Sequence, residues 1–383
     1  MIFKKIAAGL LAAAIAVTSF TTVSPKTQLK AQAATEKEVR GVWLSIYDYG
    51  DSGIGLSTDS ASTFRKNADK LITNIKKYHL NTIYMQVRAN DDAAWKSKTF
   101  TAMKEISPSV SSLAKAGKNT NSASNTLKFD PLQIMTEEAH KNGIQLIAWM
   151  NPYRMSTSYF LNPAASSSIK RVTTAVKEVM KYGVDGVVFD DYFYHASEGY
   201  WNVVKNKSTL SKDKADKLSK TAKAKNVNKL VKKIYTTVKS ADKNATFGIS
   251  PQGNLTNDES AGADVKTWVS QDGYVDYVMP QIYWTDDYGK NGGTAMFSQR
   301  LEQFTASDFD TLGKVKYIAL ALYRCGNDYT LDHGWINSDT NLAEQYEKLN
   351  EAGCTGYSLF SASYIFRGDA DDELGALNES IID

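Results

Sequence analysis

The chain has 383 residues, a formal net charge of +3 and two cysteines. Residues 1–33 contain four lysines and no acidic residue, so the rest of the chain carries a formal charge of −1. A near-neutral chain lacks the basic surface on which nucleic-acid binding depends, and two cysteines cannot build a disulfide framework. Composition therefore argues against a nucleic-acid-binding protein and against a disulfide-stabilised scaffold.

The N-terminus is typical of a targeting segment. A pair of lysines precedes an apolar run over residues 6–17, and the small residues at 31–34 resemble a cleavage site. The run is shorter than the roughly 20 apolar residues of a membrane helix. We predict a signal peptide over residues 1–33, one mature domain over residues 34–383, and no membrane attachment after cleavage. The sequence does not indicate the oligomeric state.

Short apolar segments alternate with helical patterns along the mature chain. The predicted strands are residues 40–45, 81–87, 144–150, 186–189, 246–250, 277–283, 316–322 and 356–360. Helical spacing of apolar residues predicts helices at 64–78, 131–141, 172–182, 227–239 and 342–352. Nearly continuous apolar strands that alternate with helices predict an α/β fold, a (β/α)8 TIM barrel with a parallel sheet buried on both faces.

The mature chain is longer than the roughly 250 residues typical of this fold. The extra residues lie in five segments that each follow a predicted strand, at 96–128, 155–169, 196–226, 286–313 and 324–340. Barrel enzymes carry their active sites on the loops that follow the strands. We therefore expect long βα-loop insertions that wall an elongated groove, which suits a polymeric substrate.

The two cysteines are expected to remain free. Cys325 follows the seventh predicted strand and Cys354 precedes the eighth, so they should lie at opposite ends of the barrel. At about 3.3 Å per residue, that separation exceeds the reach of a disulfide.

Two adjacent acids end the fourth predicted strand. Asp190 and Asp191 follow apolar residues 187–189 directly. Burying a carboxylate is costly unless its charge is used, and two adjacent carboxylates raise the pKa of one of them, which suits a general acid. Side chains alternate along a strand, so both acids can face one site only if the strand ends before them. We take both as catalytic candidates, although Asp191 could instead cap the following loop.

Polar or aromatic residues end nearly every predicted strand. They include Ser45, Tyr47, Gln86, Arg88, Asn151, Arg154, Tyr192, Gln252, Gln281, Tyr283, Trp284, Tyr323 and Ser361. Each alone is more often a capping or packing residue, but their coincidence at one face indicates a site. We expect substrate binding by Gln86, Arg88, Asn151, Arg154, Tyr192, Tyr194, Gln281, Trp284 and Tyr323. No metal-binding or phosphate-loop motif is present, and no metal or cofactor is expected.

Eight short motifs, taken in order, resemble the bacterial glycosyl-hydrolase-like family 10. They are Arg40-Gly-Val-Trp43, Gln86-Val-Arg88, Phe129-Asp-Pro-Leu132, Ala139-His140, Asn151-Pro-Tyr-Arg154, Phe189-Asp-Asp-Tyr-Phe-Tyr194, Gly248-Ile-Ser-Pro251 and Met279-Pro-Gln-Ile-Tyr-Trp284. The chain departs from the family pattern at His195, where proline is common, and at Gln252, where an aromatic residue is common. The resemblance implies a secreted or wall-associated bacterial barrel that hydrolyses peptidoglycan strands lacking stem peptides, with Asp190 and Asp191 as its catalytic centre.

The aspartate pair is also similar to the adjacent pair of barrel enzymes that remove N-acetylglucosamine from proteins. This likeness implies substrate-assisted catalysis, in which Asp190 orients the 2-acetamido group of the substrate. Asp191 would be the general acid and base, and Tyr283 would bind the acetamide carbonyl.

Two alternatives stay open from the sequence. The first is a glycosidase that acts on another polysaccharide and pairs Asp190 with a distant acid such as Asp92 or Asp286. The second is a barrel that binds glycan without cleaving it.

Overall fold

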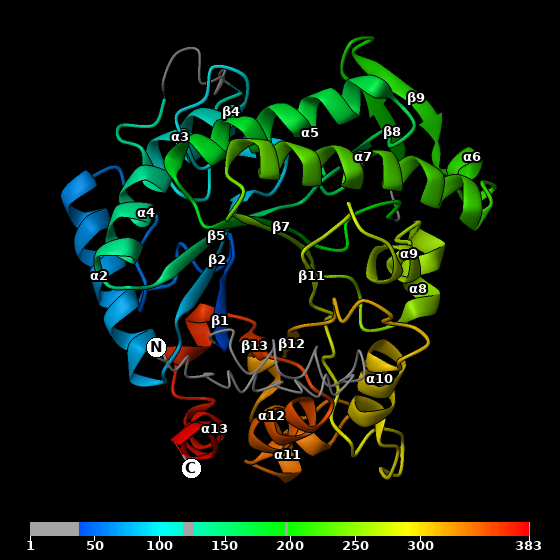
Figure 1. Ribbon diagram of the computed structural model, residues 1–383. Coiled ribbons are helices and arrows are strands. Elements are labelled where there is room, and N and C mark those ends of the chain that lie inside the picture. Colours follow the sequence, from blue (N-terminus) through cyan, green and yellow to red (C-terminus); the bar gives the residue numbers. More distant parts are fainter. Residues whose placement is uncertain (1–37, 118–125, 196–197, 383) are drawn as a thin grey trace, which may run out of the picture.

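The computed structural model describes residues 38–117, 126–195 and 198–382. The predicted signal peptide lies outside these residues, as does part of the predicted insertion at 96–128. Eight parallel strands form one curled sheet in the order β11-β10-β7-β5-β2-β1-β13-β12 (Figure 1). The structure thus confirms the α/β class and the eight-stranded parallel sheet.

Each strand of this sheet coincides with a predicted one. The strands are β1 (Val39–Leu44), β2 (Thr82–Arg88), β5 (Gln145–Met150), β7 (Gly186–Phe189), β10 (Thr246–Ile249), β11 (Tyr277–Val278), β12 (Ile318–Leu320) and β13 (Gly356–Leu359). The prediction was wrong about the length of β11, which was expected to reach residue 283. Pro280 has no N–H to donate to a neighbouring strand, so the regular ladder stops before it.

Single backbone hydrogen bonds continue beyond β11. Val278 N donates to Lys314 O (2.7 Å), and Ala319 N donates to Pro280 O (3.0 Å). These bonds place the chain around β11 beside the chain around β12, at the two ends of the strand order.

Helices follow every strand of the sheet and lie on its outside (Figure 1). In chain order, α2 (Ala61–Lys77) follows β1, α3 (Pro108–Lys115) and α4 (Pro131–Lys141) follow β2, and α5 (Ser166–Val179) with the 3₁₀ turn η2 (Met180–Tyr182) follows β5. Next come α6 (Lys212–Asp216) and α7 (Lys220–Ala241) after β7, α8 (Leu255–Ala261) and α9 (Val265–Ser270) after β10, and α10 (Met296–Thr305) after β11. Last come η3 (Leu322–Arg324), α11 (Gly334–Asn337) and α12 (Asn341–Glu351) after β12, with η4 (Ala362–Ile365) and α13 (Asp371–Ile382) after β13.

Local sequence signals explain the helix ends. The Asp130 side chain accepts from Gln133 N at the start of α4, and Pro131 occupies the first turn, where its missing N–H costs nothing. The helix stops before Gly143, whose φ of +71° favours glycine. The five helices predicted from apolar spacing appear close to their expected positions.

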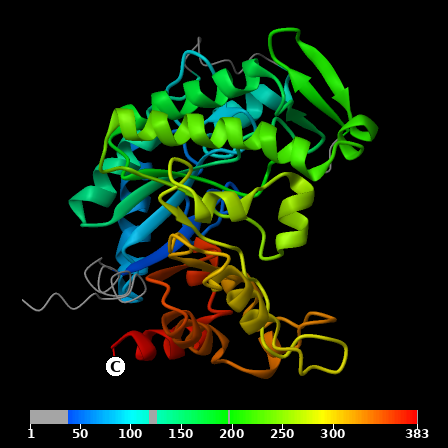
Figure 2. The ribbon, with the colours of Figure 1, turned by 45° about the vertical axis from the view of Figure 1, so that its right-hand side comes forward.

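Two of the predicted insertions contribute a small second sheet. It consists of β6 (Tyr159–Leu161), β8 (Gly199–Asn202) and β9 (Lys207–Ser211), and the latter two project from one end of the molecule (Figure 2). A further pair, β3 (Asp92–Ala93) and β4 (Thr101–Ala102), follows β2. All five strands come after β2, β5 or β7 in the chain.

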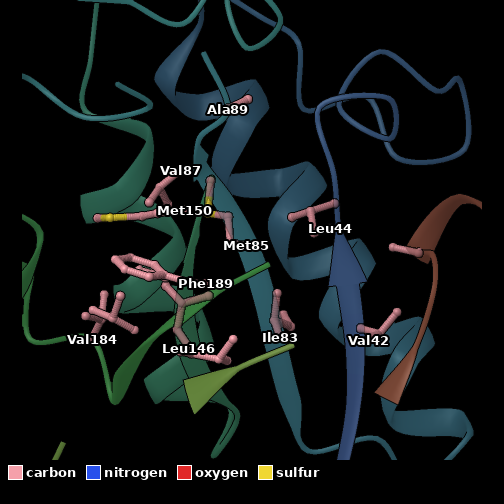
Figure 3. Packing of buried hydrophobic residues seen from close by; sticks show 14 of the residues in the cluster. Val42, Leu44, Ile83, Met85, Val87, Ala89, Leu146, Met150, Val184 and Phe189 are labelled. Atoms are coloured by element: carbon pink, nitrogen blue, oxygen red, sulfur yellow. The ribbon is translucent and has the colours of Figure 1, made fainter. Parts of the chain in front are cut away.

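Side chains alternate between two cores. Val42, Leu44, Ile83, Met85 and Phe189 belong to the large core between the strands and the helices (Figure 3). The alternate positions form a second cluster on the inner face of the curled sheet, with Trp43, Tyr84, Ile147, Trp149, Val188, Tyr277, Met279 and Ala319. Because alternation continues to the strand ends, the inner-face positions just beyond the strands converge on one place.

The two cysteines are buried and unbridged, which confirms the prediction of free thiols. Burial raises the pKa of Cys354 to about 12, so its thiol stays protonated and unreactive at neutral pH. In the part of the chain that the structure describes, no helix has both the length and the apolar character needed to cross a bilayer.

Candidate active site

A pocket of about 130 Å³ lies at the carboxyl ends of the sheet strands. Its lining residues are Trp43, Tyr47, Gln86, Trp149, Asn151, Arg154, Asp190, Asp191, Tyr192, Gln281, Tyr283 and Phe360. Ligand pockets commonly measure about 300–1,000 Å³, so this one suits a single ring-sized group with the rest of a longer ligand outside it. The structure brings together here both predicted acids, Tyr283, and five of the residues expected to bind substrate.

A larger hollow of about 550 Å³ lies at the opposite ends of the strands, where Val39, Thr82, Gln145 and Thr246 begin β1, β2, β5 and β10. Active sites of parallel barrels lie at the carboxyl ends of the strands, and the adjacent acids lie in the smaller pocket. We therefore assign the smaller pocket as the candidate active site.

Strand alternation delivers most of these side chains. Gln86 lies two residues after Tyr84, Asn151 two after Trp149, and Asp190 two after Val188, so each continues the inner face of its strand. The strand β7 ends at Phe189, which frees Asp191 from the alternation. Both acids therefore line the pocket, which answers the geometric question that the sequence left open.

Asp190 is the more deeply buried acid, with 3% of its surface exposed. Trp149 Nε1 donates to its Oδ2 (3.0 Å), and Tyr192 N donates to its Oδ1 (3.3 Å). Burial raises the pKa of Asp190 well above its usual range, and the charge of Asp191 raises it further, whereas the two hydrogen bonds oppose the rise.

Asp191 is half-buried and faces a second set of donors. Gln281 Nε2 donates to its Oδ1 (3.4 Å) and also to Ser250 O (3.0 Å). Burial raises the pKa of Asp191, while the charge of His195 and hydrogen bonds from Gln281 and Gln252 lower it. The acids titrate as a pair, and a pair that holds one proton supplies a proton donor and an anion side by side.

Aromatic side chains form much of the remaining wall. Tyr283 packs against Phe360 with ring centroids 6.1 Å apart, and burial raises the pKa of Tyr283 well above its usual range. Its phenol therefore stays neutral and can donate a hydrogen bond. The Arg154 guanidinium lies 5.0 Å from the ring centre of Tyr192, and Tyr47 is 76% exposed at the rim.

Arg88, which was expected to bind substrate, does not line this pocket. The register between β2 and β5 shifts between Gln86 and Arg88, which interrupts the alternation that would have turned Arg88 inward. The side chain is fully buried, with Nη1 donating to Asn151 O (2.5 Å) and Nη2 donating to Asp91 Oδ1 (2.5 Å). Arg88 thus holds the loop that carries Asn151.

Three further predicted binding residues also lie outside the pocket lining. Tyr194 is 5% exposed, and its hydroxyl accepts from Asn226 Nδ2 (3.0 Å), so it is a packing residue. Tyr323 contacts Tyr283 edge to face at 5.9 Å, so it packs against a residue of the pocket wall without lining the pocket. The carbonyl of Trp284 accepts from a glutamine of α12, and its ring is not part of the pocket wall.

The two distant acids that the sequence suggested as partners of Asp190 make hydrogen bonds outside the pocket. Asp92 is 7% exposed, and its Oδ1 accepts from Ala89 N (2.9 Å) and Asn90 N (3.0 Å). Asp286 accepts from Lys348 Nζ (2.7 Å) and Ser298 N (2.8 Å). Neither acid lines the pocket with Asp190.

Sequence reasoning missed Trp43, Trp149 and Phe360 as site residues. A usable signal was present for the first two, because Trp149 and Trp43 lie two residues before the strand-end residues Asn151 and Ser45 and therefore share their face. Within residues 38–117, 126–195 and 198–382, no group of three or more histidine, cysteine, aspartate or glutamate side chains is placed to hold a metal ion.

The family model described as Glycosyl hydrolase-like 10 matches residues 38–158 and 154–337, more than half of the chain. The protein belongs to this glycosyl-hydrolase-like family. Glycosyl hydrolase DigH of Escherichia coli strain K12 is 28% identical over 417 residues, covering 90% of this chain and 88% of DigH. Glycosyl hydrolase YngK of Bacillus subtilis strain 168 is 26% identical over 357 residues, covering 81% of this chain and 65% of YngK. Family membership and these relatives support glycoside hydrolase activity.

Solved structures share the fold of this family member at low identity. A candidate chitinase C-terminal domain from Desulfitobacterium hafniense DCB-2 aligns with a TM-score of 0.52 at 10% identity, covering 90% of this chain and 100% of that one. The exo-β-1,4-mannosidase Op5Man5 from Opitutaceae bacterium strain TAV5 aligns with a TM-score of 0.50 at 10% identity, covering 90% and 59%. At such identities the likeness concerns the fold alone.

Proposed function

We propose that the protein is a secreted glycoside hydrolase of the bacterial cell wall that cleaves N-acetylhexosamine polymers, in particular peptidoglycan strands without stem peptides. One observation carries the proposal. The adjacent Asp190 and Asp191 line one pocket at the carboxyl ends of a parallel sheet, and burial raises the pKa of both. A glycosidase needs a proton donor and an anionic group beside the bond that it cleaves.

The proposal includes a closed (β/α)8 barrel with long βα-loop insertions in a single mature domain. The bonds from Val278 to Lys314 and from Ala319 to Pro280 support closure, because they join the chain around β11 to the chain around β12. The small sheet of β6, β8 and β9 lies after β5 and β7, where an insertion would extend a binding groove for a polymer.

The mechanism that we propose is substrate-assisted. The acetamido carbonyl oxygen of the substrate attacks the anomeric carbon as the bond to the leaving sugar breaks, and Asp191 gives its proton to the leaving oxygen. Asp190 accepts a hydrogen bond from the acetamido N–H, and this contact favours its ionised form. Water then adds to the anomeric carbon and gives a proton back to Asp191, which restores the acetamido group and retains the anomeric configuration.

The pocket chemistry supports the assignment of the three roles. Asp191 is the acid with greater access to solvent and therefore to a leaving group and water. Asp190 is held from two sides by Trp149 and Tyr192, which suits a group that must orient a substrate. Tyr283 keeps its proton and can donate it in a hydrogen bond to the acetamide carbonyl.

Digestion of peptide-free sacculi, with mass spectrometry of the products, tests the proposal. We expect soluble N-acetylated sugar fragments with the wild type and none with Asp191→Asn. Rescue of Asp190→Asn by azide would instead favour a glycosidase that uses an enzymic nucleophile. Binding of the sacculi without release of fragments, unchanged in Asp190→Ala, would indicate a non-catalytic glycan-binding barrel.

A further inference from the structure

One buried polar atom of the pocket lining has no hydrogen-bond partner among the residues that the structure describes. Asn151 follows β5, lines the pocket and is fully buried, yet its Nδ2 finds no acceptor among the residues that the structure describes. Its main chain is held in place, because its N donates to Arg88 O (2.9 Å) and its O accepts from Arg88 Nη1 (2.5 Å). A buried donor without an acceptor costs free energy that a ligand atom would recover.

The direction of this amide is set by a short relay of hydrogen bonds. Ile46 N donates to Gln86 Oε1 (2.9 Å), and Gln86 Nε2 donates to Asn151 Oδ1 (2.9 Å). A backbone N–H can only donate, so the Gln86 amide cannot turn over without facing one donor with another. The fixed Gln86 amide therefore keeps Asn151 Oδ1 directed toward Gln86. Asn151 Nδ2 is left without an acceptor among the described residues.

We propose that Asn151 Nδ2 is the donor that selects an oxygen acceptor on the sugar bound in the pocket, and that Gln86 is a positioning residue for this donor. The inference rests on the proposed glycan hydrolysis and deepens it. The acceptor is the acetamido carbonyl oxygen, because a sugar hydroxyl can donate as well as accept and would not distinguish the two directions of the Asn151 amide. An ammonium group, as on a deacetylated sugar, presents only donors and is rejected at this position.

Two nearly isosteric substitutions replace the hydrogen-bond donor that faces the pocket with an acceptor, each by a different route. In Asn151→Asp, one carboxylate oxygen keeps the bond from Gln86 and the other replaces Nδ2, so an acceptor faces the ligand. In Gln86→Glu, one carboxylate oxygen keeps the bond from Ile46 N. The other faces Asn151 as an acceptor, so Asn151 must turn its amide and present Oδ1 to the pocket. In this proposal Gln86 acts only through Asn151, so a similar loss of sugar binding in both variants identifies the relay of hydrogen bonds.

Both substitutions should weaken binding about 10- to 100-fold, the range expected when a buried hydrogen bond loses its partner. The loss should appear as a lower kcat as well as a higher KM, because in the proposed mechanism the acetamido carbonyl oxygen is the atom that attacks the anomeric carbon. Asn244→Asp, which makes the same change of charge at the opposite ends of the strands, is the control and should behave as the wild type. Thermal melting checks that each variant is folded.

The test is calorimetric binding of N-acetylglucosamine trisaccharide and of the equivalent glucose trisaccharide to the mature protein, alongside digestion of peptide-free sacculi. A loss confined to the N-acetylated sugar supports the acetamido carbonyl as the acceptor, whereas an equal loss for both sugars contradicts that assignment. If the enzyme is active but Asn151→Asp or Gln86→Glu binds as tightly as the wild type, the relay is refuted while the hydrolase function stands. A wild type that neither binds nor digests glycan overturns the proposed function and this inference together.

Discussion

Replacing Trp149 by phenylalanine should move the acid limb of the pH–activity profile to higher pH. Trp149 Nε1 donates to Asp190 Oδ2 at 3.0 Å, and Asp190 is 3% exposed, so water cannot readily replace this donor. The bond favours the ionised carboxylate and lowers its pKa against the effect of burial. A hydrogen bond to a charged group is worth about 1.5–3 kcal/mol, and one pKa unit corresponds to about 1.4 kcal/mol. Trp149→Phe should therefore raise the apparent pKa of the acid limb by about 1 to 2.

The assay is the pH dependence of kcat/KM on soluble, peptide-free glycan, which reports the free enzyme. The matched control is Trp43→Phe, because Trp43 lies in the same inner-face cluster and lines the same pocket, but its Nε1 donates to Ser358 Oγ (2.8 Å). Trp43→Phe should lose a similar amount of packing and leave the acid limb in place. Equal acid limbs in the two variants would show that the Trp149 bond does not tune Asp190.

Three other substitutions test the environment of the site. Asp258 is 1% exposed, its Oδ2 has no donor in the described part of the chain, and burial raises its pKa well above the usual range. The folded state therefore holds the proton more tightly than the unfolded chain, so this residue lowers stability as pH rises above about 3.9. In urea unfolding, Asp258→Asn should be more stable than the wild type at pH 7, and the gain should vanish near pH 3; an equal gain at both pH values contradicts the argument. Tyr47→Ala should raise KM about 2- to 10-fold, because an exposed aromatic contact is worth about 0.5–1.5 kcal/mol, without changing the melting temperature; an unchanged KM would exclude Tyr47 as a sugar platform. Arg88→Met should lower the free energy of unfolding by about 3 kcal/mol, since it leaves the buried Asp91 with fewer partners, whereas a raised KM at wild-type stability would return Arg88 to substrate binding.

Much of the architecture follows from local pattern. Helices cover one face of these parallel strands, and an inner core covers the other. Each strand must therefore be apolar on both faces, and it appears in the sequence as a short apolar run. The apolar runs before Asp190 and Asn151 end where β7 and β5 end, so the sequence alone predicts these side chains at the carboxyl edge of the sheet. The pair Asp190 and Asp191 was recognisable because two adjacent acids rarely end a buried strand without a function.

The remaining features depend on contacts between segments that are far apart in the chain. The register shift between Gln86 and Arg88 belongs to the pairing of β2 with β5, and the Arg88 side chain is bonded to the Asn151 main chain outside the pocket lining. The bond from Trp149 to Asp190 joins residues of two different strands, and the direction of the Asn151 amide depends on Ile46 N, which follows a third strand.

The sequence by itself determined the order of strands and helices and which residues stand at the strand ends, because these depend on the polarity of successive side chains. Only the tertiary structure decided how deeply each acid is buried, which donors surround it and therefore in which direction its pKa moves. Desolvation and hydrogen bonding are set by neighbours in space, and the order of residues along the chain does not specify those neighbours.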